Sequence, residues 1–317
     1  MRLFDAPLLT ALGGARRILV AGAGGGFDIY SGLPIYLALR SAGKEVHLAN
    51  LSFASLVPRL GVERSDALLR VDADSPIEKG QYFPEVYLSR FLREQGIPAP
   101  VWCFKQAGVV PIAEAYGILR KELDLDAVVL VDGGTDSLMR GDEAGLGTPQ
   151  EDSASMVAAD SLGLERTFLV CLGFGVDHYH GVSHFDVLQA IQELAQKDAY
   201  LGAWALTGAM EESRTLLDAV TYVHDAQPNH PSIVCSSVAS AVEGMFGDVH
   251  RTERTRNSRL FINPLMSIYF AFRLKEVVQR LMYADRIRPT VSYFELSQAI
   301  ATFRAQITPR PRTSIPL

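Results

Sequence analysis

Short apolar runs alternate with amphipathic segments of helical length along most of this 317-residue chain. The runs cover residues 17–22, 45–50, 100–105, 127–132, 167–172, 201–206 and 231–236. Because they are apolar throughout, they are typical of strands buried on both faces of a parallel sheet. The pattern therefore predicts a Rossmann-like α/β fold, a mostly parallel sheet with helices on both faces.

The chain is long enough, at 48% hydrophobic residues, to bury a large core. We expect a single α/β domain over residues 1–317, with a C-terminal elaboration over 250–317. The tail 308–317 carries three prolines and should be extended. It either packs on a neighbouring subunit of a homo-oligomer or has a free end.

Net charge and hydropathy exclude several classes of partner. The formal charge of −6 at pH 7 argues against nucleic-acid binding, which needs a basic face to displace counterions. No run approaches the roughly 18 apolar residues needed to span a bilayer, and the N-terminal apolar segment is too broken for a signal peptide. We expect a cytoplasmic protein with a small-molecule partner and no membrane partner. The cysteines Cys103, Cys171 and Cys235 are widely spaced and fit core packing.

A glycine-rich loop, "GAGGGFD", follows the first apolar run. Gly24, Gly25 and Gly26 permit close backbone approach, and a helix starting near Asp28 would direct free N–H groups at an anion such as phosphate. The third glycine of a dinucleotide fingerprint would fall at Phe27, and no Walker lysine follows. The alternative is a tight turn capped by Asp28.

The run 127–132 leads into a second loop, "GGTDSLMRGDEAGLGTPQEDS", which is rich in carboxylates. Thr148, Pro149 and Glu151 predict a helix start, which accounts for Glu151 and Asp152. The other carboxylates repel one another unless Arg140, a cationic substrate group or a divalent cation such as Mg²⁺ lies among them. We therefore expect metal ligands at Asp132, Asp142 and Glu143, a catalytic carboxylate at Asp136, and substrate contacts at Gly133, Gly134 and Thr135.

A third candidate, "GFGVDHYHGVSHFD" at 173–186, holds three of the seven histidines of the chain. His178, His180 and His184 have a spacing that suits a transition metal, with Asp177 as a further ligand or base. A solvated histidine cluster or a helix cap at Ser183 also explains the pattern. Asp177, His178 and His184 are the candidates for proton transfer.

The predicted topology brings the first two loops together. Ligands of open parallel sheets bind beyond the carboxyl ends of the strands, so the loops after residues 22 and 132 should emerge at one edge. We expect Asp28 and Asp136 to line one pocket.

Three segments carry a resemblance to a family of microbial proteins known as domain of unknown function 1152. They are "GAGGGFDIYSGLPIYLALRSAGKEVHLANLSF", "VDGGTDSLMRGDEAGLGTPQEDS" and "GVDHYHGV", and the resemblance extends over nearly the whole chain. It implies a Rossmann-like fold and no particular chemistry.

Both glycine loops are also similar to the pyrophosphatase loop of ATP-using amide and thiolation enzymes, Ser-Gly-Gly-x-Asp-Ser. Asp28 and Asp136 stand at its acidic position. Gly24 and Ile29 replace the serines in the first copy, and Asp132 replaces the leading serine in the second. Asp132 would repel a pyrophosphate unless a cation intervened.

Together these features favour an enzyme, a hydrolase or transferase, that acts on a small anionic metabolite bearing phosphate or resembling a nucleotide. The alternative is a non-catalytic nucleotide-binding sensor or assembly protein. Convergence of several carboxylates and histidines on one edge favours the enzyme, because a passive binder needs fewer titratable groups.

Overall fold

Five parallel strands form the centre of a nine-stranded sheet in the computed structural model, which describes residues 2, 5–258 and 260–315. The sheet order is β3-β4-β5-β2-β1-β6-β7-β9-β8. The parallel strands are β1 (Arg17–Gly22), β2 (Glu45–Ser52), β5 (Val101–Lys105), β6 (Ala127–Gly133) and β7 (Thr167–Leu172). The predicted α/β fold is confirmed, and all five of these strands were predicted from the sequence.

Antiparallel strands extend both ends of this core. They are β3 (Val62–Ser65), β4 (Leu68–Val71), β8 (Tyr200–Ala205) and β9 (Ile268–Arg273). Of these four strands, only β8 was predicted from the sequence, within a sheet that was expected to be mostly parallel. Instead β9 lies between β7 and β8, so a segment from the predicted C-terminal elaboration is an internal strand of the sheet.

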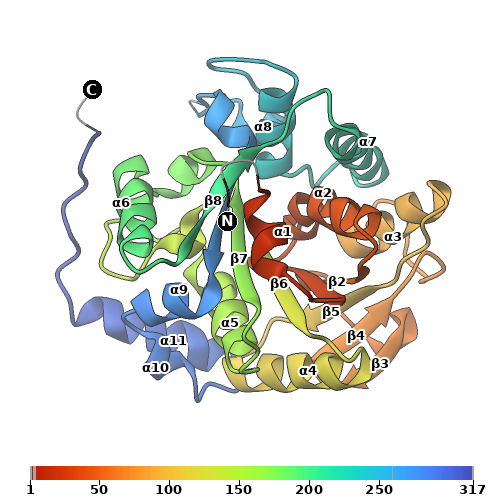
Figure 1. Ribbon diagram of the computed structural model, residues 1–317, viewed down its shortest axis with the longest axis horizontal. Coiled ribbons are helices and arrows are strands. Elements are labelled where there is room, and N and C mark those ends of the chain that lie inside the picture. The colour runs from red at the N-terminus through yellow and green to blue at the C-terminus, as the bar shows by residue number, and fades with distance from the viewer. Residues whose placement is uncertain (1, 3–4, 259, 316–317) are drawn as a thin grey trace.

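Helices cover both faces of the sheet (Figure 1). One face packs against α1 (Pro7–Leu12), α2 (Asp28–Ser41), α3 (Pro84–Glu94), α7 (Glu211–Ala226) and α8 (Ile233–Val242). The other packs against α4 (Val109–Glu122), α5 (Pro149–Asp160), α6 (His184–Ala195), α9 (Leu274–Arg280), α10 (Ala284–Ile287) and α11 (Tyr293–Ala305). None of the helices in the described ranges is long and apolar enough to cross a membrane.

The prediction of a strand at 231–236 was wrong, because α8 begins there. The Ser232 hydroxyl accepts a hydrogen bond from the Cys235 amide at 3.1 Å, which satisfies one free N–H of the first helical turn. The predicted start of α5 at Pro149 is correct. However, the Thr148 hydroxyl donates to Asp136 and Asp152 instead of capping the helix.

The chain changes direction between β1 and β6. From β1 it adds β2 and then β5 on one side, and it returns across the sheet to add β6 and β7 on the other. Such a reversal opens a crevice beyond the carboxyl ends of the two central strands. Both glycine loops start in this crevice.

The C-terminal segment is extended, as expected, and runs alongside α6 (Figure 1). Arg310 pairs with Asp142 and Glu143, and Ser183 donates to the carbonyl of Thr313. This segment is therefore tethered to its own chain.

Candidate functional site

A cavity of about 480 Å³ lies where β1 and β6 end. Five aspartates from five different segments line it. Asp28 begins α2, Asp132 is near the end of β6, Asp136 begins the short helix η2 (Asp136–Leu138), Asp152 is in the first turn of α5, and Asp177 lies in η3 (Val176–His180). The structure thus brings Asp28 and Asp136 into one pocket. All five carboxylates are buried, with residue exposures of 2–9%.

Three of the five form a tighter group. Asp28, Asp132 and Asp152 each offer a carboxylate oxygen, and these oxygens all lie within 4.8 Å of one another. Asp152 was assigned only to the start of a helix in the sequence analysis. Its helical position also directs its carboxylate into the cavity.

The glycines of the loops leave room for these carboxylates. A Cβ at Gly24 would overlap Oδ1 of Asp152 and lie 2.9 Å from Oδ2 of Asp28. A Cβ at Gly147 would overlap Oδ2 of Asp136. Glycine at these positions therefore permits the close approach of backbone and carboxylate.

The first glycine loop differs from the predicted phosphate cradle. The Gly24 amide donates to Oδ2 of Asp28 at 2.6 Å, and the Gly26 amide donates to the carbonyl of Leu51 at 3.1 Å. Two of the amides expected to face a phosphate are therefore engaged within the chain. The loop holds the Asp28 carboxylate in the position where an external anion was expected.

Three of the aspartates also hold the loops around them. Asp132 accepts from the Ser137 hydroxyl at 2.5 Å, and Asp177 accepts from the Thr135 amide at 2.6 Å. Asp136 accepts from the amide and the hydroxyl of Thr148 at 2.7 and 2.9 Å.

Burial raises the carboxylate pKa values throughout the cluster. Burial and the nearby Asp136 raise the pKa of Asp28 from 3.8 to about 7, although the Gly24 amide opposes this. Burial first, and then the charge of Asp136, raise the pKa values of Asp132, Asp152 and Asp177 well above the ordinary range. At neutral pH the cluster must therefore hold protons or a cation.

The rim of the same cavity is exposed and more basic. It includes His180, His230 and Arg254, and Ile233 and Val234 at the N-terminus of α8 also line the cavity. Phe53 and Tyr82 add aromatic surface. His180 was expected as a metal ligand or as part of a solvated histidine cluster and was not among the residues chosen for proton transfer. The N-terminus of α8 was not expected here, because a strand was predicted at 231–236.

A further buried carboxylate, Glu85, is linked to the first glycine loop through Asn50. The Asn50 amide donates to the carbonyl of Gly26 and to Oε1 of Glu85, both at 2.8 Å. Burial raises the pKa of Glu85 to about 7, although the Asn50 hydrogen bond opposes this. Asn50 and Glu85 lie in a strand and a helix far from the loop in sequence, so no local motif indicated this contact.

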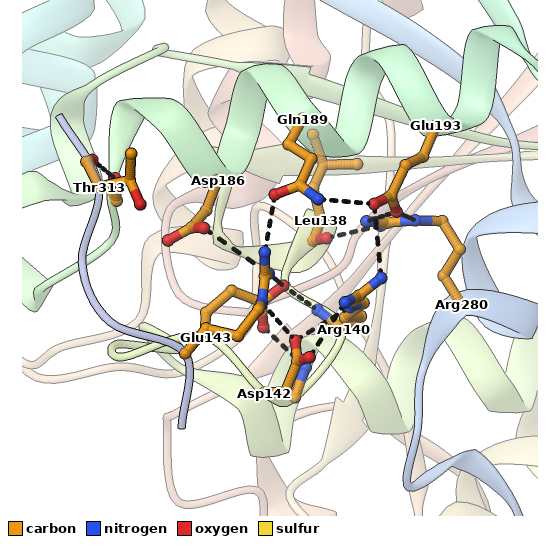
Figure 2. A network of polar contacts seen from close by, with 12 residues as sticks. Leu138, Arg140, Asp142, Glu143, Asp186, Gln189, Glu193, Arg280 and Thr313 are labelled. Atoms are coloured by element: carbon orange, nitrogen blue, oxygen red, sulfur yellow. Dashed lines mark hydrogen bonds and ion pairs between the residues drawn. The ribbon is translucent and has the colours of Figure 1, made fainter. Parts of the chain in front are cut away.

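Two of the expected metal ligands lie elsewhere. Figure 2 shows Asp142 and Glu143 in a network with arginines. Asp142 accepts from Arg140 and Arg310 at 2.9 and 3.0 Å, and Glu143 accepts from Arg310 at 3.0 Å. The structure does not bring Asp142 and Glu143 to Asp132, because these arginines neutralise them locally.

Two of the predicted proton-transfer residues also lie outside the cavity. His178 and His184 stack with ring centroids 5.4 Å apart in a separate recess beside Arg312–Ile315. Of the predicted ligand contacts, Gly24, Gly25, Gly26, Asp28 and Gly133 line the cavity, whereas Gly134 and Thr135 are not among its lining residues. Thr135 acts instead through its hydrogen bonds to Asp177.

The comparison with protein families supports the resemblance noted in the sequence. Residues 61–306 match the family described as "Protein of unknown function (DUF1152)", so the chain belongs to this family. The matched segment includes the second loop and the histidine segment but starts after the first glycine loop. No curated protein matches the chain.

Proposed function

We propose that this member of the DUF1152 family is an enzyme that hydrolyses or transfers a group of a small phosphate-bearing metabolite. The supporting observation is that one cavity combines a buried carboxylate floor with a basic rim. Phosphoryl chemistry needs positive charge around the phosphate and a group that moves a proton. The carboxylates of the floor can place positive charge near the phosphate only by binding a cation. The basic residues of the rim would contact the phosphate directly.

The rim residues have complementary roles in this proposal. Arg254, His230 and the N-terminus of α8 would contact the phosphate oxygens. Phe53, which is 43% exposed, offers a ring face for a planar group such as a nucleobase. The preferred substrates are therefore nucleotides or other phosphate esters with an aromatic group.

Proton transfer would fall to Asp177 or His180. In hydrolysis, the water oxygen forms the new P–O bond, the bond to the leaving group breaks, and the water proton passes to one of these side chains. The pKa of Asp177 is raised, first by burial and then by the charge of Asp136, so its carboxylate is a stronger base than that of an ordinary aspartate.

The test is a screen of phosphate esters and nucleotides for phosphate release or group transfer, with and without Mg²⁺. With the best substrate, we expect Asp177→Asn or His180→Ala to lower kcat at least 100-fold, in the range of general acid–base catalysis. His178→Ala is the matched control for His180→Ala, because His178 lies two residues before His180 in the sequence but outside the cavity. Binding of a nucleotide without turnover would overturn the proposal that the protein is an enzyme. It would support the alternative of a non-catalytic nucleotide-binding sensor.

A further inference from the structure

We propose that Asp28, Asp132 and Asp152 form a binding site for one divalent cation of the Mg²⁺ or Mn²⁺ class. The three residues come from the start of α2, the end of β6 and the first turn of α5. Each offers one oxygen within 4.8 Å of the other two. Oxygens that share a divalent cation at 2.0–2.6 Å are separated by up to about 4–5 Å, so this spacing fits a common ion.

An unpartnered oxygen supports the site independently. Oδ1 of Asp152 is buried without a hydrogen-bond partner, and the residue is 2% exposed. The same oxygen approaches Gly24 so closely that a Cβ there would overlap it. A buried carboxylate oxygen without a partner is costly, and a cation in the cavity would remove that cost.

The described part of the chain supplies no alternative counter-charge at this position. Within the described ranges, no lysine or arginine side chain lies within ion-pair distance of Asp28, Asp132 or Asp152. Among the residues that the structure describes, Arg254 is the only arginine that lines the cavity, and it is exposed and donates to the carbonyl of Pro231. The cavity therefore has room and charge for a cation that comes from solution.

The donor set determines the class of metal. All three ligands are carboxylates, with no histidine or cysteine in the group. Oxygen ligands favour hard cations over zinc or copper. Three carboxylates leave other coordination positions on the open side of the cavity for water or for a substrate phosphate.

This site deepens the proposed function, and the metal alone tests it. Full-length protein freed of metal with EDTA would be titrated with Mn²⁺ at pH 8 and followed by electron paramagnetic resonance. The parent should bind one Mn²⁺ per chain, and Mg²⁺ should compete for it. Asp152→Asn should weaken Mn²⁺ binding at least 10-fold, and Gly24→Ala should do the same by placing a methyl group against Asp152 and Asp28.

Glu151→Gln is the matched control. Glu151 precedes Asp152 on α5 but is bonded to Gln106 and Tyr293 and does not line the cavity. This variant should bind Mn²⁺ like the parent. Asp132→Asn replaces Asp152→Asn if the latter does not fold, as judged by circular dichroism.

Two results would overturn the cation site. One is no saturable binding of Mn²⁺ or Mg²⁺ at millimolar concentration by the folded parent. The other is unchanged affinity in folded Asp152→Asn and Asp132→Asn. Turnover of a phosphate ester without metal binding would overturn only the cation site, whereas metal binding without turnover would overturn only the enzyme.

Discussion

The segment from the end of β6 to the first turn of α5 supplies carboxylates to two clusters with opposite electrostatics. Asp132, Asp136 and Asp152 face the cavity and have no cationic partner within ion-pair distance among the described residues. Asp142 and Glu143, in the same segment, are bonded to Arg140 and Arg310. The difference shows that the density of acidic residues does not identify a site. Whether the protein supplies its own counter-charge is the more informative observation.

The two clusters also respond to pH with opposite signs. Burial alone would raise the pKa values of Asp142 and Glu193, but the adjacent arginines lower both below the ordinary range. The network therefore stabilises the fold above the ordinary carboxyl pKa. The cavity carboxylates have raised pKa values, so they favour the folded state when they are protonated.

The largest effect is expected from Arg280→Met, which breaks the arginine network. Arg280 is 9% exposed, donates to Glu193 at 2.9 Å and to the carbonyl of Leu138 at 2.8 Å, and both are drawn in Figure 2. Without the Arg280 guanidinium, the partly buried Glu193 carboxylate and the Leu138 carbonyl lose this hydrogen-bond donor. We expect a loss of about 3–5 kcal/mol in the free energy of unfolding, measured by urea denaturation.

Arg288→Met is the control for this variant. Arg288 is more exposed and pairs with Asp285 and Asp160 at 3.4 and 3.8 Å. Arg288→Met should lower the free energy of unfolding by less than about 1 kcal/mol. If Arg280→Met is no more destabilising than Arg288→Met, the network does not differ from an ordinary surface ion pair.

The second prediction concerns pH in the absence of divalent cations. The pKa of Asp28 is about 7 in the folded protein and 3.8 ordinarily, so its stabilising contribution is complete below pH 4 and is lost as pH rises through 7. Each pKa unit corresponds to about 1.4 kcal/mol, so unfolding in EDTA should require a few kcal/mol less at pH 8 than at pH 5.

Two additions make this pH test specific to the cavity. Asp152→Asn should flatten the profile between pH 5 and 8, because it removes one of the repelling carboxylates. Mg²⁺ should restore stability at pH 8 in the parent and not in this variant. If the unfolding free energy of the parent does not change between pH 5 and 8, the cavity carboxylates do not repel one another without a cation, and the prediction is wrong.

The smallest effect is expected from Asp136→Asn, measured at pH 5 to limit charge repulsion. Asp136 accepts two hydrogen bonds from Thr148, so its role is partly structural, which the sequence analysis did not foresee. We expect a loss of about 1 kcal/mol in unfolding free energy. A double-mutant cycle with Thr148→Val should show coupling, and additive effects would mean that the two side chains do not interact.

Local pattern alone was sufficient for the parallel core of the fold. Buried parallel strands are apolar at every position, so β1, β2, β5, β6 and β7 stand out in the sequence. The polar strand β3 has no such signal. The apolar start of α8 was mistaken for a strand because the capping role of Ser232 was not recognised.

Strand polarity also allowed the sequence to predict that Asp28 and Asp136 share a pocket, since the carboxyl ends of β1 and β6 meet at one edge. Tertiary structure alone decided which carboxylates remain without a counter-charge. Arg280 and Arg310 are more than 130 residues from the loop that they contact. Asp152 meets Asp28 only because the sheet brings the first turns of α2 and α5, which cover opposite faces, to the same edge. Electrostatic pairing depends on distance in space, which no local pattern in the sequence encodes.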